Sequence, residues 1–345
     1  RDRSSPGIPD YTRILGDRPM TQARILDDLA RFGPDAPGGG AEVSTGAARE
    51  MADHLARTHR ENFSVLTRLV PEDRRADFAA VYAFCRTADD LGDEIGDPER
   101  SLELLAWWRH EIDLAWEGRP HHWVFRALQP TIERFELDRL PFVDLVSAFE
   151  QDQTVTRYRS WDQLLDYCAR SADPVGLLVL RLLDQPASGE IAIRSNAICT
   201  GLQLANHWQD IARDLIERDR VYVPSELIEI EDFEAKVRLS ATRGWADPDF
   251  LEAARRLVRG CVERTWPLFE QGATLPGMLD PMAGAVVEVL GGGGTAILRS
   301  IEDWDFETVL HRPTLGRLDQ IRIVATAWWN LRRARRRSTL RRIEG

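Results

Sequence analysis

Carboxylate side chains recur four residues apart at two places in the chain. Asp89 and Asp93 form the first pair, Asp210 and Asp214 form the second, and the amide of Asn206 lies four residues before Asp210. On a helix, residues four apart share one face, with Cβ atoms roughly 5–6 Å apart. Carboxylates this close repel each other unless a cation lies between them. Two such pairs facing each other could bind Mg²⁺, which prefers oxygen ligands and commonly bridges carboxylates to substrate phosphates. The spacing therefore predicts a magnesium site for a diphosphate group.

A single pair of acids at this spacing is weak evidence for a metal site. The chain has 56 acidic residues, and most such pairs lie on solvated helix faces. Here both pairs follow strongly apolar segments, at residues 78–84 and 198–205. Acids on apolar helices tend to face the interior, where an unpaired charge is costly. The context therefore favours a cation site over a solvated face.

The composition limits the class of protein. The chain has 345 residues, is 43% hydrophobic and carries a formal net charge of −11. It can bury a large core in one or two domains, and its acidity argues against a nucleic-acid partner. Four widely spaced cysteines indicate free thiols in a reducing compartment. Because no apolar run approaches the ~20 residues of a membrane span and no apolar signal segment is present, we expect a cytoplasmic protein.

The helical pattern covers most of the chain. Residues 1–43, with five prolines and a glycine run, predict an extended or poorly ordered tail with one short helix, Met20–Phe32. Residues 44–345 carry apolar residues at three- and four-residue steps, which predicts a single all-α domain. We expect helices near 45–59, 72–95, 101–117, 121–135, 140–155, 161–170, 174–184, 188–218, 225–240, 247–270, 278–302 and 316–339. Inside the helix at 278–302, Gly291–Gly294 predicts either a break or a very close approach of a backbone or ligand.

The C-terminal segment is strongly basic. Seven arginines lie from Arg332 to Arg342, after the apolar residues Ile323, Val324 and Trp328. A basic amphipathic helix can bind anionic lipid, which would place the protein peripherally on the inner face of the cytoplasmic membrane. A solvated tail explains the same pattern, and the sequence leaves both interpretations open.

Four ordered motifs resemble those of the squalene and phytoene synthase family, the head-to-head prenyl synthases. Residues 82–90 (YAFCRTADD) resemble the first aspartate motif, and residues 206–224, with RVYVP at the end, resemble the second. Residues 151–158 and 167–176 match two blocks between them, and the resemblance covers roughly residues 50–340. It implies an isoprenoid-synthase-like helical bundle around a central apolar cavity, a prenyl diphosphate substrate and a Mg²⁺ cofactor.

Within this family, the chain is most similar to bacterial hydroxysqualene synthases of the hopanoid and squalene pathway. Residues 59–63 replace the serine-rich segment of carotenoid-forming members, and Gln209 replaces an arginine that is common in those members. Residues 171–176 also resemble the hydroxysqualene synthases. The resemblance implies conversion of presqualene diphosphate and water to hydroxysqualene and diphosphate, in functional partnership with a presqualene diphosphate synthase. The missing arginine suggests that one diphosphate is handled per turnover.

Two alternative functions are weighed against this one. The first is condensation of two prenyl diphosphates to presqualene diphosphate, squalene or phytoene. The second is a binding or assembly protein on the same scaffold, which the four retained aspartates argue against.

The resemblance also implies roles for individual residues. Catalytic roles fall to Asp89, Asp93, Asp210, Asp214 and Tyr167. The metal ligands would be these four aspartates and Asn206. Substrate-binding roles fall to Asn62, Tyr82, Arg86, Gln203, Asn206, Arg220 and Tyr222. Mg²⁺ would neutralise the diphosphate as its C–O bond ionises, the arginines would hold phosphate oxygens, and the two substrate-binding tyrosines would donate to the leaving group. Aromatic faces would stabilise the rearranging cation.

Some residues near the motifs also have a structural interpretation. Asn206 could be a packing amide, and Tyr167 could be a buried core tyrosine. We interpret Asp152 as structural, paired with Arg157. We interpret His207 as a packed or solvent histidine, because one residue after Asn206 it points off the acidic face.

Overall fold

The computed structural model describes residues 18–37, 41–58 and 69–316, with single positions between 319 and 331. Its described residues form helices and no β-strand, which confirms the all-α prediction. The α-helices are α1 Arg18–Phe32, α2 Thr45–Thr58, α4 Arg75–Asp93, α5 Pro98–Trp116, α6 Trp123–Phe135, α7 Leu140–Gln151, α8 Trp161–Ser171, α9 Asp173–Leu182, α10 Gly189–Gln209, α11 Ile211–Arg218, α12 Phe233–Arg243, α13 Pro248–Gly272, α14 Leu275–Met278 and α15 Pro281–Asp303. Two short 3₁₀ turns cover Glu72–Arg74 and Ser225–Leu227.

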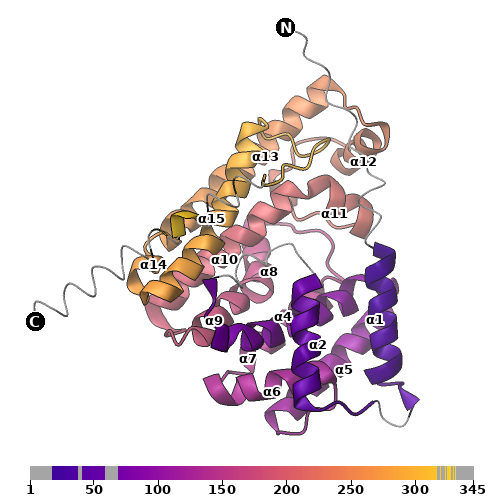
Figure 1. The fold of residues 1–345 in the computed structure, drawn as a ribbon. Coiled ribbons are helices and arrows are strands. Elements are labelled where there is room, and N and C mark those ends of the chain that lie inside the picture. Colours follow the sequence, from indigo (N-terminus) through magenta and orange to yellow (C-terminus); the bar gives the residue numbers. More distant parts are fainter. Residues whose placement is uncertain are drawn as a thin grey trace, which may run out of the picture.

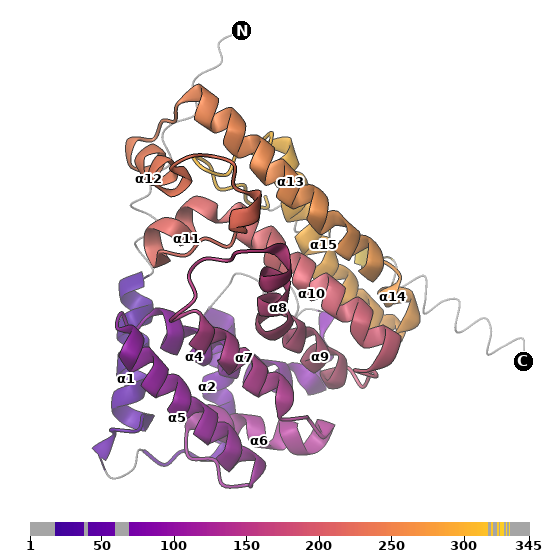
Figure 2. The same cartoon turned by 180° about the vertical axis from the view of Figure 1, so that it is seen from behind.

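Two hydrophobic cores organise the helices. The larger core lies among α1, α2, α4–α7, α9 and the first half of α15, where the ring of Phe84 contacts those of Trp108, Phe125 and Phe142. The second lies among the end of α7, α8, α10–α13 and the second half of α15, and it includes the fully buried Trp208. Helices α10, α13 and α15 run side by side obliquely along one flank of the molecule (Figures 1 and 2).

The helix with the first acid pair ends at Asp93. Gly96 has a φ of 79°, a conformation that favours glycine, and turns the chain toward α5. Asp97 then caps α5, because its side chain accepts a hydrogen bond from the Glu99 N–H, and Pro98 occupies the first turn. The helix expected at 101–117 therefore begins three residues earlier.

The helix expected at 188–218 is divided at Asp210. Its φ of −107° and ψ of 16° end α10, and α11 begins at the next residue. The Asp210 N–H still donates to the Asn206 carbonyl at 3.0 Å, and the Asp214 N–H donates to the Asp210 carbonyl at 2.8 Å. The four-residue spacing thus survives the break, and the motif keeps its helical character.

The segment after α11 pairs with the loop after α7. The Val221 N–H donates to the Thr156 carbonyl at 2.9 Å, and the Ser225 N–H donates to the Tyr158 carbonyl at 2.8 Å. This pairing keeps residues 220–227 out of an α-helix, and the helix expected at 225–240 begins only at Phe233. It also places Arg220 beside the end of α7.

Helix α15 continues without a break through Gly291–Gly294. A Cβ atom on Gly294 would lie 2.5 Å from Phe269 Cζ and 2.8 Å from Leu202 Cδ2. The glycine therefore allows close packing of α15 on α10 and α13, which decides between the two interpretations of this run. By length and composition α15 could span a membrane, but Val286, Leu298 and Ile301 are buried in the bundle, as in a core helix.

The N-terminal segment contains the expected short helix. Helix α1 starts two residues before the predicted Met20, and its Ile25 and Phe32 are buried in the larger core. Residues 18–37 are therefore a docked helix and turn, which confirms the short helix expected in this segment. Residues 1–17 and most of the helix expected at 316–339, with the basic segment after it, lie outside the described residues. The division into a tail and a single domain at residue 44 stays a prediction.

Candidate active site

The first acid pair lies at the C-terminal end of α4, within reach of three arginines. The Asp93 side chain is 5% exposed, and its two carboxylate oxygens lie 2.9 Å from Arg218 Nη2 and 2.9 Å from Arg220 Nη1. Asp89 is 34% exposed and lies 3.4 Å from Arg86 Nη1. Loss of solvation, together with the charge of Asp93, raises the pKa of Asp89.

The second acid pair lies at the junction of α10 and α11. Arg312 forms a two-pronged ion pair with Asp210, with Nη2 at 3.0 Å from Oδ2. The neighbouring Gln209 side chain donates to the Pro313 carbonyl, so residues 312–313 lie against this motif. Burial and the charge of Asp210 raise the pKa of Asp214 to about 7.

Arg218 and Arg220 connect the two acid pairs. Their charges act on Asp89 of α4 and also on Asp214 of α11, and both arginines contact Asp93 directly. Carboxylates of both motifs therefore lie within electrostatic range of the same two arginines, and the expected convergence of the four aspartates on one metal site stays a prediction. The cations seen here are arginine side chains.

The donor set fits Mg²⁺ in chemistry but not as one preformed cluster. Across the described residues, no group of three or more His, Cys, Asp or Glu side chains is arranged to hold a metal ion. The carboxylates of Asp89 and Asp214 nevertheless have raised pKa values, so each lacks full compensation of its charge. Hard oxygen ligands in this state suit Mg²⁺ bound together with a phosphate group. Each acid pair could therefore hold its own ion.

Asp152 is a site residue that the sequence analysis missed. It is buried at the end of α7, accepts a 2.8 Å hydrogen bond from the Tyr167 hydroxyl and lies 3.8 Å from Arg220 Nη1. Burial raises its pKa to about 7, although Arg220 acts in the opposite direction. The predicted pair with Arg157 is wrong. The Arg157 side chain instead binds Glu234 of α12 and Asp219, beyond the paired segments.

An aromatic cluster packs beside this network. The His207 and Tyr222 rings stack with centroids 3.6 Å apart, and the Tyr167 and Tyr158 rings lie 5.7 Å from Tyr222. Burial and the nearby Arg220 lower the pKa of His207 to about 3, so the imidazole is neutral. This confirms His207 as a packed histidine. Tyr167 is both a buried core residue and a hydrogen-bond donor to the site.

The remaining predicted substrate-binding residues lie on α4 and α10. Tyr82 is half-buried one turn before Arg86, and burial raises its pKa. Gln203 is half-buried and Asn206 is exposed, both within two turns before Asp210. Asn62 lies outside the described residues. The roles of all these residues stay proposals.

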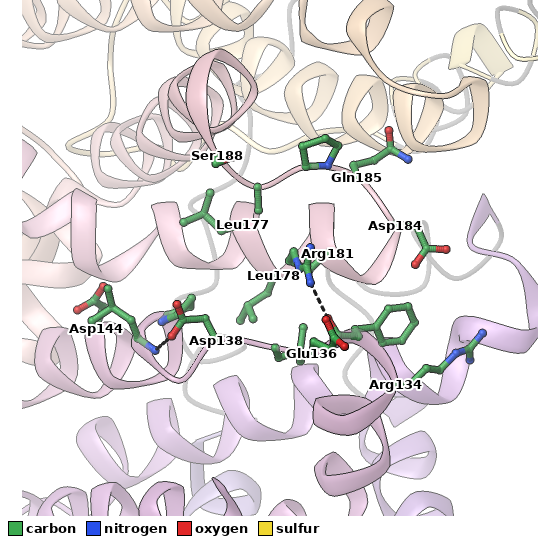
Figure 3. A pocket seen from close by; sticks show the side chains of 16 residues that line it. Arg134, Glu136, Asp138, Asp144, Leu177, Leu178, Arg181, Asp184, Gln185 and Ser188 are labelled. Atoms are coloured by element: carbon green, nitrogen blue, oxygen red, sulfur yellow. Dashed lines mark hydrogen bonds between the residues drawn. The ribbon is translucent and has the colours of Figure 1, made fainter.

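A pocket of about 850 Å³ lies between the end of α6, the start of α7 and α9, and neither of the two acid pairs lines it (Figure 3). Arg181 donates to the Phe135 carbonyl at 2.9 Å across its floor. Acids and arginines are mixed along its wall, and none of the predicted site residues lines it. The central apolar cavity that the resemblance implied stays a prediction.

Comparison with known proteins identifies similar sequences. A model described as squalene/phytoene synthase matches residues 56–319. Phytoene synthase 3 of Zea mays is 30% identical over 78% of this chain and 64% of its own length. A hydroxysqualene synthase of Zymomonas mobilis is 36% identical over 49% of this chain and 56% of its own length. The chain thus matches between half and two thirds of these curated relatives.

Solved structures show the same fold. A squalene synthase, HpnC, of Alicyclobacillus acidocaldarius matches with a TM-score of 0.65 and 36% identity, over 77% of this chain and 97% of the other. A dehydrosqualene synthase matches with a TM-score of 0.69 over 84% of this chain and 98% of the other. At 19% identity, the second likeness concerns the fold alone.

Proposed function

The chain belongs to the squalene/phytoene synthase family of prenyl-diphosphate-processing enzymes, and on this premise we propose that it is a Mg²⁺-dependent hydroxysqualene synthase. It would convert presqualene diphosphate and water to hydroxysqualene and diphosphate. Support comes from the 35–36% identity to three hydroxysqualene synthases over about half the chain. The observation that carries the proposal is the junction where Arg218, at the end of α11, and Arg220 form ion pairs with Asp93 of α4.

The junction can bind a diphosphate and stabilise its departure. Arg86, Arg218 and Arg220 supply fixed positive charge, and their planar forks suit phosphate oxygens. Asp89, Asp93, Asp210 and Asp214 would hold Mg²⁺, which when bound neutralises charge on the diphosphate. Because these groups are oriented before the substrate arrives, they stabilise charge as it develops on the leaving group.

The aromatic cluster beside the junction suits the second half of the reaction. Tyr158, Tyr167, Tyr222 and the neutral His207 present ring surfaces without a positive charge, beside the buried Arg220. Aromatic faces attract cations. In the proposal they stabilise the carbocation until water adds to it, and the bundle restricts the approach of other water.

Condensation of two prenyl diphosphates is the second candidate. The 30% identity to a phytoene synthase over 78% of the chain favours it. Purified protein incubated separately with farnesyl diphosphate and with presqualene diphosphate distinguishes the two, with products measured by mass spectrometry. Turnover of farnesyl diphosphate alone would refute our choice.

Two further features belong to the same proposal. A hydroxysqualene synthase consumes presqualene diphosphate, so a functional partnership with the enzyme that makes it is expected. Because substrate and product are apolar, we also propose a cytoplasmic enzyme that contacts the inner face of the cytoplasmic membrane through its basic C-terminal segment. Sedimentation with anionic vesicles, for the full chain and for a chain ending at residue 331, tests the contact.

A further inference from the structure

Helix α1 lies outside residues 56–319, yet it is fastened to the family domain. Its Asp28 accepts a 2.7 Å hydrogen bond from Trp123 Nε1 and lies 3.1 Å from His122 Nε2, both at the start of α6. The adjacent Ile25 is fully buried in the larger core. Both views show α1 packed along the outside of the α4–α5 region (Figures 1 and 2). The helix is therefore built into the bundle.

The docked helix brings one arginine to the first acid motif. Arg24 forms an ion pair with Asp90 Oδ2, and two residues earlier Gln22 donates to the Glu94 carbonyl at 3.0 Å. Asp90 is 0% exposed and directly follows the proposed ligand Asp89. Helix α1 thus contacts the acid motif at two points.

Asp90 is shared between two arginines. Its Oδ1 lies 2.6 Å from Arg86 Nη2, while Arg24 takes Oδ2. The other nitrogen of the same guanidinium, Arg86 Nη1, faces Asp89 at 3.4 Å. A buried carboxylate requires compensation of its charge. Because Arg24 neutralises part of the Asp90 charge, Arg86 does not have to compensate that charge alone. Its guanidinium can therefore remain turned toward Asp89.

The two arginines keep unused hydrogen-bonding capacity. Within the described part of the chain, the Nε atoms of Arg24 and Arg86 are buried and donate no hydrogen bond. Burial lowers the pKa of Arg24, with a contribution from Arg86, so the two cations are held close together at a cost. An arriving anion would offset this repulsion.

We propose that Arg24 is a positioning residue of the active site. By neutralising Asp90 from α1, it keeps Arg86 oriented toward Asp89 and available to an oxygen of the diphosphate. This inference rests on the proposed function, because it assumes that a diphosphate binds at the first acid motif. It assigns to α1, a segment outside the family match, a part in substrate binding.

The test replaces Arg24 and measures binding without turnover. Calorimetry with inorganic diphosphate and Mg²⁺ is run on the unmodified chain, on Arg24→Gln, on Arg24→Lys and on Arg31→Gln. Arg31 is an exposed arginine of the same helix and serves as the matched control. We expect Arg24→Gln to weaken binding about tenfold, comparable to the loss of one charged hydrogen bond. Arg24→Lys should recover most of the affinity, and Arg31→Gln should not change it.

A double-mutant cycle separates positioning from folding. If Arg24 acts by neutralising Asp90, Arg24→Gln should have little further effect on diphosphate affinity in an Asp90→Asn background. Loss of thermal stability in Arg24→Gln with unchanged diphosphate affinity would overturn the inference. An equal loss in both backgrounds would also overturn it.

The same proteins also test the proposed function, and the outcome is distinct from that for Arg24. An unmodified chain that binds inorganic diphosphate but releases none from farnesyl or presqualene diphosphate would refute the function, while the Arg24 comparison would stand. Turnover that is equally fast in the unmodified chain and Arg24→Gln, at substrate concentrations below KM, would refute the inference alone.

Discussion

Asp93 is a buried carboxylate of α4 whose negative charge is compensated by Arg218 and Arg220. Both arginines come from the distant segment at the end of α11. Replacement of Asp93 by asparagine would leave two arginines with less compensation, and such losses typically cost about 3–5 kcal/mol. We therefore expect Asp93→Asn to lower kcat/KM for diphosphate release by at least about a hundredfold.

The matched control for this change is Asp219→Asn. Asp219 also binds two arginines, Arg157 and Arg238, but its side chain is 66% exposed. Exposed pairs contribute little, so its kcat/KM should stay within about threefold of the unmodified enzyme. Equal losses in the two variants would contradict a special role for Asp93.

Asp173 allows a prediction of pH dependence away from the proposed metal ligands. It is buried at the start of α9 and accepts a 2.8 Å hydrogen bond from the Thr200 hydroxyl. Burial raises its pKa to about 6, from a usual value of 3.8. Between these pH values the folded state holds a proton that the unfolded state has released. The contribution to the free energy of unfolding therefore falls as pH rises from about 4 to 6 and is constant above that range.

Replacing Asp173 by asparagine removes this titration. Chemical denaturation between pH 4 and 7 should show a smaller decline for Asp173→Asn than for the unmodified protein, by up to about 3 kcal/mol. Parallel curves for the two proteins would contradict the raised pKa.

The sequence indicated the candidate carboxylates, whose role stays a prediction, but it did not indicate their ion-pair partners. Four-residue spacing after apolar turns indicated Asp89, Asp93, Asp210 and Asp214 without any fold. The partner of Asp152 was predicted wrongly, because it depends on the pairing of residues 156–158 with 221–225, and no local pattern encodes that pairing. The match of residues 151–158 and 167–176 to two family blocks was the signal that could have pointed to Asp152.

At the scale of single helices, periodicity predicted most elements to within a few residues. Predictions failed where one local interaction decides a boundary. The Asp97 cap moved the start of α5, and the backbone of Asp210 divided the long helix at 188–218. A cap or a single-residue break changes stability by only about 1 kcal/mol. The spacing of apolar residues carries no information about such local interactions, so it does not predict the exact end of a helix.

The glycine run in α15 gives a prediction at this scale. Gly294→Ala should lower the free energy of unfolding by about 1–3 kcal/mol, because its Cβ would meet Phe269 and Leu202 at the contact with α13 and α10. Gly293→Ala is the matched control, since nothing among the described atoms lies within 4 Å of its Cβ position. It should be neutral or stabilise the helix by up to about 1 kcal/mol. Urea denaturation of both variants tests this, and equal effects would argue against close packing at Gly294.

At the scale of the whole molecule, the site joins the two cores. Helix α4 belongs to the larger core and α11 to the second, and Arg218 and Arg220 cross between them to Asp93. Helix periodicity predicts that each element is amphipathic but not which elements meet. The motif resemblance predicted the helical bundle. The structure then showed that Arg218 and Arg220 connect the two cores and that α1 docks on the bundle.

The proposed metal dependence of the reaction would be a property of this junction as a whole. Asp89→Ala and Asp210→Ala each remove a carboxylate from a different acid pair, so each should abolish Mg²⁺-dependent release of diphosphate. A malachite-green assay with pyrophosphatase measures the release over a Mg²⁺ titration. Full activity in either variant would show that the assignment of the acids is wrong.

The most direct test of the central claim follows the oxygen atom of the product. Purified enzyme is incubated with presqualene diphosphate and Mg²⁺ in ¹⁸O-labelled water, without nicotinamide, and the product is examined by mass spectrometry. We predict hydroxysqualene that carries the label, formed together with an equal amount of diphosphate. An unlabelled product, a hydrocarbon product, or no reaction with presqualene diphosphate would contradict the proposed function.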